Sequence, residues 1–84
     1  WNDVGSWSAL WEIKEKDSDG NVINGDVINL NSKNCYINSK DIFVGAIGLE
    51  DIVIVTSENG ILVSKKDKVQ DVKIIAEELK KRAK

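Results

Sequence analysis

Residues 22–30 read Val-Ile-Asn-Gly-Asp-Val-Ile-Asn-Leu, and the fold is predicted most directly from this segment. Two β-branched pairs are each followed by an asparagine, and the pattern returns as Tyr-Ile-Asn at residues 36–38. β-Branched pairs favour strands, whereas Asn, Gly and Asp favour tight corners. The segment therefore predicts short strands stacked as the coils of a β-helix-like domain, with small or polar residues at the corners.

The same alternation continues outward to residue 64. Apolar runs that predict strands lie at 22–23, 27–30, 35–37, 42–47, 52–56 and 61–63, with turn residues at 24–26, 31–34, 38–41, 48–51 and 58–60. No helical pattern separates these runs, so an all-β segment is expected. Because short apolar runs discriminate poorly between topologies, a small antiparallel sheet is the alternative.

A short helix is predicted before the strands, over residues 7–13. Gly5 and Ser6 supply a break and a cap, and Trp7 and Trp11 share one face of the helix. Two tryptophans four residues apart bury a large area when they pack. We therefore expect them in a core or an interface.

An amphipathic helix is predicted after the strands. Asp67 and Gln70 fit a start that resembles a capping box. The apolar stripe should pack on the β segment, and it consists of Val69, Val72, Ile75, Ala76, Leu79 and Ala83. The predicted fold class is thus mainly β with flanking helices.

Composition limits the classes of function. The 84 residues carry 12 basic and 14 acidic side chains in no basic stripe, so we expect no nucleic-acid partner. Cys35 is the single cysteine and there is no histidine, so no internal disulfide or His/Cys zinc site is expected. No apolar run reaches the roughly 18 residues that span a bilayer. A cytoplasmic protein without membrane contact is expected.

The motifs of self-contained active sites are absent, including GxxxxGK, GxSxG, HExxH and CxxC. The sequence also contains no methionine and starts at Trp1. We therefore expect the chain to be part of a longer protein.

The first eleven residues, Trp-Asn-Asp-Val-Gly-Ser-Trp-Ser-Ala-Leu-Trp, resemble the W-x-D-V-G-S-W-x-x-L-W signature of mannose-1-phosphate guanylyltransferases, a family of sugar-phosphate nucleotidyltransferases. The resemblance extends along essentially the whole chain. Further blocks are Asp-Gly-Asn-Val at 19–22, Gly-Asp-Val at 25–27, Asn-Cys-Tyr-Ile at 34–37, Gly-Leu-Glu-Asp-Ile-Val-Ile-Val-Thr at 48–56, Leu-Val at 62–63 and Gln-Asp-Val-Lys at 70–73.

The resemblance implies an activity, a cofactor and site residues. The activity is transfer of guanylyl from GTP to mannose 1-phosphate with release of pyrophosphate, assisted by Mg²⁺. Asp3 stands where related nucleotidyltransferases have an aspartate that helps to hold the metal, although an Asx turn would also explain it. Gly5 and Ser6 would shape the sugar-phosphate pocket, and a turn would explain them equally. The other site residues would lie upstream, so this chain alone is expected to be inactive.

The resemblance also implies a division of the chain. Residues 1–20 would end the catalytic domain, and residues 21–84 would form a short left-handed β-helix-like domain with its terminal helix. This domain would pack on its own catalytic domain or another subunit, and a homo-oligomer is expected. Separated from that domain, the helix at 7–13 should drive dimers or strand exchange. The competing hypothesis is a non-catalytic oligomerisation or sugar-binding β module with the tryptophans as an exposed platform.

Overall fold

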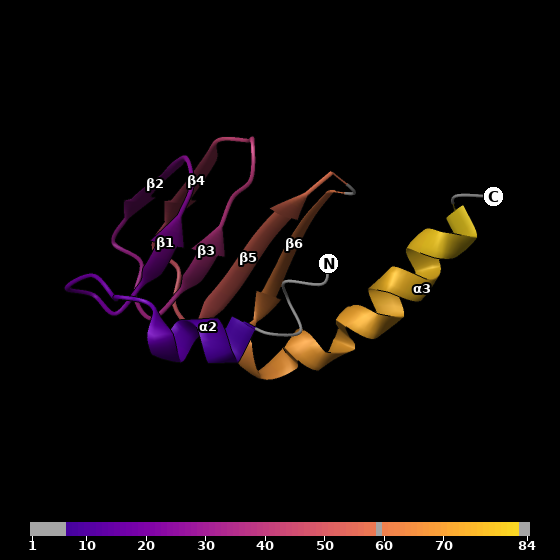
Figure 1. The fold of residues 1–84 in the computed structure, drawn as a ribbon, viewed down its shortest axis with the longest axis horizontal. Coiled ribbons are helices and arrows are strands. Elements are labelled where there is room, and N and C mark those ends of the chain that lie inside the picture. Colours follow the sequence, from indigo (N-terminus) through magenta and orange to yellow (C-terminus); the bar gives the residue numbers. More distant parts are fainter. Residues whose placement is uncertain (1–6, 59, 83–84) are drawn as a thin grey trace.

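The computed structural model describes residues 7–58 and 60–82. Strands stack side by side above a short N-terminal helix, and the C-terminal helix extends away from them (Figure 1). In chain order the elements are α2 (Trp7–Ile13), β1 (Val22–Asn24), β2 (Val27–Leu30), β3 (Tyr36–Asn38), β4 (Val44–Ile47), β5 (Ile52–Ser57), β6 (Gly60–Lys65), the 3₁₀ helix η1 (Lys66–Asp71) and α3 (Val72–Arg82).

The strands form two sheets. One has four strands in the order β1-β3-β5-β6, and the other has two strands, β2 and β4. β1, β3 and β5 are parallel, as are β2 and β4, and a parallel bridge joins Lys33 to Glu50. Successive coils therefore pass through the same faces in turn, which confirms the predicted β-helix-like stack.

The antiparallel alternative is wrong for these five strands, because consecutive strands enter different sheets and the neighbours within a sheet run parallel. An antiparallel pair of strands does occur at the end of the stack. β5 and β6 form an antiparallel hairpin in which Val55 pairs with Leu62.

The two coils differ in length. Val22 pairs with Tyr36, 14 positions on, whereas Tyr36 pairs with Val53, 17 positions on. The three additional residues lie between β3 and β4, where residues 39–43 form a longer connection than residues 25–26 between β1 and β2. This loop explains why the strand predicted over 42–47 begins only at Val44.

The corners of successive coils use the same backbone conformation. Asn31 and Gly48 follow paired residues and have φ of 61° and 62°, and Asn34 and Asp51 have φ of 55° and 57°. Positive φ is unfavourable for most side chains but accessible to Gly, Asn and Asp. The polar corner residues are thus required by the backbone, as the turn pattern predicted.

The core consists of two clusters on opposite faces of the four-stranded sheet. Val53 and Val55 of β5 belong to the cluster beneath α2 and η1, whereas Ile54 belongs to the cluster inside the coils. The cluster beneath the helices contains Val22, Tyr36, Val53, Val55, Leu62 and Val69, and the inner cluster contains Cys35, Ile37, Ala46 and Ile54.

The two predicted helices agree with the structure to different degrees. α2 spans the predicted residues 7–13. The C-terminal prediction is wrong in two respects. Asp67 and Gln70 lie within η1, whose N-cap, Lys65, makes no side-chain capping hydrogen bond. The apolar stripe packs only at its start: Val69 is buried and Val72 is partly buried against the same core cluster, but no described residue of α3 is fully buried. The chain turns away through η1, so α3 leaves the sheet (Figure 1).

Candidate functional site

The sequence-predicted site residues, Asp3, Gly5 and Ser6, lie outside the described residues. Trp7 follows Ser6 directly and begins α2. The structure therefore describes the element to which the predicted site is covalently joined, and the way that element is held.

α2 is held by its apolar face. Trp7, Leu10 and Trp11 are partly buried and pack against the core cluster beneath the helix. The ring of Trp7 meets Tyr36 edge to face, with 6.4 Å between centroids and an interplanar angle of 60°. This geometry is favourable for aromatic pairs. The tryptophans thus pack, as predicted, and their rings do not form an open platform. The surface that covers them is the chain's own β domain, so the expectation that this helix packs on the catalytic domain, and drives dimers when separated from it, is wrong in its premise.

A lysine from the far end of the stack completes this contact. Lys66 Nζ lies 3.3 Å from the centroid of Trp11 and 5.7 Å from that of Trp7, within range for cation–π attraction. The backbone N–H of Lys66 donates to the carbonyl of Asp51 at 2.9 Å. We call Trp7, Trp11 and Lys66 the lysine–tryptophan clasp. No motif signalled Lys66, because it lies far from the tryptophans in the sequence.

The ammonium of Lys66 is partly desolvated. Burial lowers the pKa of Lys66, while the charge of Asp51 acts in the opposite direction and that of Lys16 lowers it further. Lys16 itself lies over Trp11, with its Nζ 4.9 Å from the ring centroid and a hydrogen bond of 2.5 Å to the carbonyl of Trp11. Two cations therefore converge on one indole.

A buried asparagine joins the first coil to the second. Asn21 is 1% exposed; its Oδ1 accepts from the Cys35 N–H at 2.8 Å, and its Nδ2 donates to the Ser32 carbonyl at 2.8 Å. Asp17 Oδ1 accepts from the N–H groups of Asp19 and Asn21, both at 2.9 Å. The backbone hydrogen bond from Asn21 is the main cause of a lowered pKa for Asp17. These polar groups are used to build corners.

The described residues offer little for chemistry. Within residues 7–58 and 60–82, no group of three or more His, Cys, Asp or Glu side chains is placed to hold a metal ion. Cys35 is fully buried, and its thiol donates to the carbonyl of Lys33 at 3.3 Å. No helix in this part of the chain is long and apolar enough to cross a membrane.

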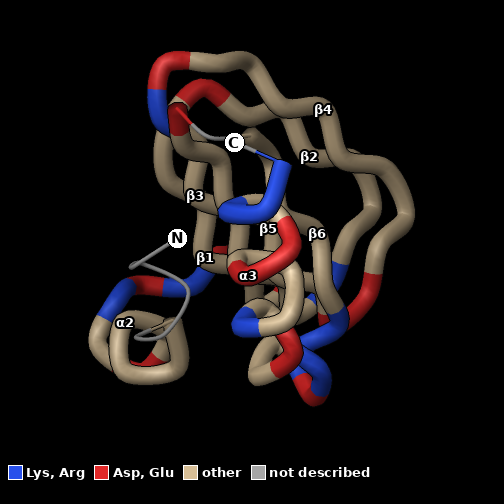
Figure 2. The backbone as a smooth tube through the Cα atoms, turned by 90° about the vertical axis from the view of Figure 1, so that its right-hand side faces the viewer, with Lys and Arg blue, Asp and Glu red and all other residues tan. Residues whose placement is uncertain are grey.

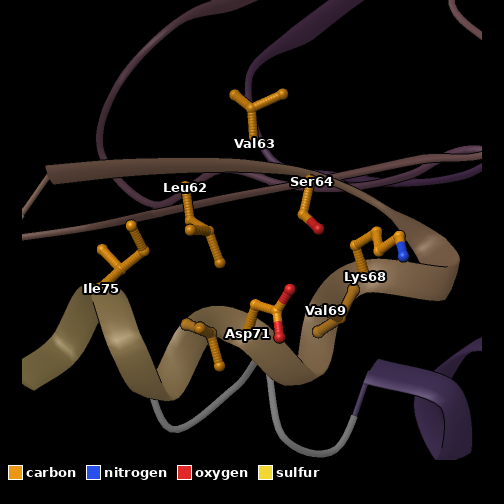
Figure 3. Close-up of a pocket in the computed structure, with 8 residues that line it drawn as sticks. Leu62, Val63, Ser64, Lys68, Val69, Asp71 and Ile75 are labelled. Carbon is orange, nitrogen blue, oxygen red and sulfur yellow. The ribbon is translucent and has the colours of Figure 1, made fainter.

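A groove of about 220 Å³ lies between β6 and the η1–α3 segment (Figure 3). Leu62 points into it toward the helical segment, whereas Val63 points away. The lining is mostly apolar and consists of Leu62, Val63, Ser64, Lys68, Val69, Asp71, Val72 and Ile75. Such a groove suits an apolar side chain better than a phosphate group.

A second apolar surface lies on the outer face of the β2–β4 sheet. Ile28, Leu30 and Ile47 are each more than half exposed there, and Leu30 pairs directly with Ile47. Phe43 adds an exposed ring close to Gly45, which pairs with Ile28. Charged residues of both signs are distributed along the backbone, with a basic last turn in α3 (Figure 2).

Comparison with known proteins agrees with this architecture. The chain is 54% identical over 80 residues to a mannose-1-phosphate guanylyltransferase from Escherichia coli, covering 95% of this chain and 17% of the relative. It is 47% identical over 79 residues to the alginate biosynthesis protein AlgA of Pseudomonas aeruginosa, covering 94% of this chain and 16% of that protein. The chain thus spans about a sixth of the length of these relatives.

A solved structure has the same fold. The crystal structure of a protein named mannose-1-phosphate geranyltransferase, from Thermus thermophilus, superposes with a TM-score of 0.73 at 28% identity, over 93% of this chain and 24% of that one. Residues 20–79 match the family described as MannoseP isomerase/GMP-like beta-helix domain. This match covers more than half of the sequence, so the chain belongs to the MannoseP isomerase/GMP-like beta-helix domain family.

Proposed function

We propose that this chain is the β-helix domain of a mannose-1-phosphate guanylyltransferase, together with the last residues of the catalytic domain. The observation that carries the proposal is the 54% identity to such an enzyme over 80 residues, which include α2 and the whole stack. In the proposed reaction an oxygen of mannose 1-phosphate attacks the α-phosphorus of GTP. GDP-mannose forms and pyrophosphate leaves.

The proposed cofactor is Mg²⁺, with Asp3 as one ligand. When bound, such an ion neutralises phosphate charge and orients phosphate oxygens, and one or two carboxylates typically suffice to hold it. The described residues provide no group of three potential ligands. Because this chain covers 17% of the length of such a relative, we expect the further ligand and the nucleotide-binding residues to come from the rest of the parent protein, and this chain alone to be inactive.

The proposed contribution of residues 21–84 is assembly. Asn21, Ser32 and Asp17 are engaged in hydrogen bonds that hold corners, while the surfaces at α3 and at β2–β4 remain apolar and exposed. Exposed apolar patches of this kind typically mark contacts with other protein surfaces. We infer packing on the parent's own catalytic domain, a homo-oligomeric parent and a cytoplasmic location.

The test is guanylyl transfer from GTP to mannose 1-phosphate, measured as pyrophosphate release. Three proteins are compared: the full-length parent, its Asp3→Asn variant and this chain alone. Activity should be confined to the unaltered full-length parent. Loss of one metal-binding carboxylate should lower kcat by about a hundredfold or more, since Lewis-acid stabilisation supplies several kcal/mol.

The control variant removes one carboxylate charge, as Asp3→Asn does, but at a position away from the predicted site. Asp67→Asn alters an exposed carboxylate of η1 and should leave kcat unchanged. An inactive full-length parent would reject the proposed function and favour the non-catalytic β module. An active Asp3→Asn variant would reject the metal role of Asp3 alone.

The assembly role predicts the solution state of this chain. Because its apolar surfaces lack the rest of the parent, we expect dimers at micromolar concentration. Light scattering across that range measures the mass directly. A monomer throughout would contradict the expectation.

A further inference from the structure

We propose that Lys66 is a positioning residue: its ammonium group clasps Trp7 and Trp11 to the stack and thereby fixes α2, the helix that follows the predicted site in the sequence, on the β domain of the parent enzyme. The inference rests on the proposed function and deepens it. It assigns the β-helix domain a part in catalysis that requires no contact with substrate.

The first step of the argument is connectivity. Trp7 follows Ser6 in the chain and lies four residues after Asp3, so covalent geometry alone keeps Asp3 within about 14 Å of Trp7. Trp7 touches the β domain through Tyr36, and Lys66 reaches both tryptophans. The end of the predicted catalytic segment is therefore anchored on the β domain.

The second step is the environment of the lysine. Among the described residues, no carboxylate lies within ion-pair distance of Lys66. Its ammonium instead lies over indole faces, although burial disfavours the charge there, as the lowered pKa indicates. Trp is the best aromatic partner for a cation, and partial desolvation strengthens the attraction. The ring contacts that Lys66 makes among the described residues are thus those with Trp7 and Trp11, and the charge of Asp51 favours its protonated form.

The third step is the stiffness of the anchor. Lys66 immediately follows β6, and its backbone N–H donates to the carbonyl of Asp51, the residue that precedes β5. β5 is buried at four consecutive positions and pairs on both edges. A clasp built on this strand has little freedom to move. Reaction rates are sensitive to such placement, since a misplacement of about 1 Å can cost about a hundredfold.

The experiment uses the full-length parent with matched variants. Lys66→Met removes the charge but keeps an unbranched side chain, and Lys66→Arg keeps a cation that stacks well on tryptophan. Lys68→Met is the control, because Lys68 is exposed on the same 3₁₀ helix. Two quantities are measured: kcat and KM for both substrates, and hydrogen exchange of peptides covering residues 1–13.

Lys66→Met should lower kcat by about tenfold to a hundredfold, since a misplacement of about 1 Å can cost about a hundredfold, with KM changed less than about twofold. Exchange in residues 1–13 should become faster while β5 stays protected. Lys66→Arg should restore kcat and exchange, and Lys68→Met should match the unaltered enzyme.

Several outcomes would overturn the inference. An active parent with unchanged kcat and exchange in Lys66→Met rejects positioning and leaves the proposed function intact. Faster exchange throughout β5, or no rescue by Lys66→Arg, would indicate a merely structural role. Should Lys66→Met not fold, Trp11→Phe tests the same contact, since phenylalanine packs but binds cations less well. A parent without guanylyl transfer rejects the proposed function instead, and the exchange measurement then shows separately whether Lys66 holds α2.

Discussion

The β-stack and α3 are joined at η1, yet they bury their apolar residues to very different degrees. β5 is buried at Val53, Ile54, Val55 and Thr56, because the coil interior covers one face and the helices cover the other. α3 has no buried residue among those described, and Ile75 is 49% exposed.

The difference teaches what each sequence pattern determines. A strand in the stack finds its neighbours within the same chain, one coil away, so its burial follows from corner positions and register. Amphipathic periodicity identifies the apolar face of a helix but not the surface that covers it. The four-stranded sheet is therefore covered on both faces within this chain, whereas the burial of α3 depends on contacts that its sequence does not specify.

The strongest test of the stack is its tightest corner. Gly25 has φ of 101°, and a Cβ there would overlap the Ser39 carbonyl of the next coil. Gly25→Ala should therefore lower the free energy of unfolding by about 3 kcal/mol or more, from backbone strain plus overpacking. Urea denaturation followed by circular dichroism measures the change.

Gly48→Asn is the matched control. Gly48 has φ of 62°, its Cβ would meet nothing within 4 Å, and Asn31 adopts the same φ at the stacked corner. A cost below about 1 kcal/mol is expected. Equal costs for the two variants would show that positive φ, and not the approach of the coils, dominates these corners.

The next largest effect is expected at Asn21. Asn21→Ala leaves the buried N–H of Cys35 and the carbonyl of Ser32 without their side-chain partner. The loss should be about 2–3 kcal/mol, since an unsatisfied buried group typically costs about 1–3 kcal/mol. Thermal and urea unfolding measure it. Asn24→Ala removes an exposed hydrogen bond between the side chains of Asn24 and Asn38 and should cost less than about 0.5 kcal/mol. A loss of stability as large as that of Asn21→Ala would contradict the role of Asn21.

These corners also show how much of the fold the sequence could predict. The turn residues between the apolar runs indicated stacked coils because the constraint is local: Asn, Asp and Gly accept the positive φ that a corner requires. The asparagines of the repeats themselves were expected at corners, but Asn24, Asn29 and Asn38 lie within strands. The start of β4 at Val44 and the 3₁₀ conformation over 66–71 were missed, because loop length and packing on Leu62 decide them. Neither leaves a periodic signal.

The residues of the candidate site also differ in whether the sequence could predict their contacts. Packing of Trp7 and Trp11 was predictable from their spacing on one helical face, and it is confirmed. Lys66 could not be foreseen, since a lysine after a strand has the same local pattern whether it reaches solvent or an indole. The roles of Asp3, Gly5 and Ser6 stay predictions, which the activity measurements test.

The smallest effect on stability is expected for a substitution in α3, the less buried of the two regions. Ile75→Ala should change the free energy of unfolding of this chain by less than about 0.5 kcal/mol, because exposed positions away from special features typically lie in that range. Val69→Ala, on the buried side of η1, should cost about 1.5–2.5 kcal/mol from two lost methyl groups and the space they leave.

The midpoints of urea unfolding of both variants, measured at two protein concentrations, show whether another copy of the chain contributes to these costs. A cost for Ile75→Ala that grows with concentration would mean that a second copy covers α3, because a bound partner stabilises the folded state by mass action. A large cost independent of concentration would mean that α3 folds back onto β6, and the difference between the two regions would then disappear.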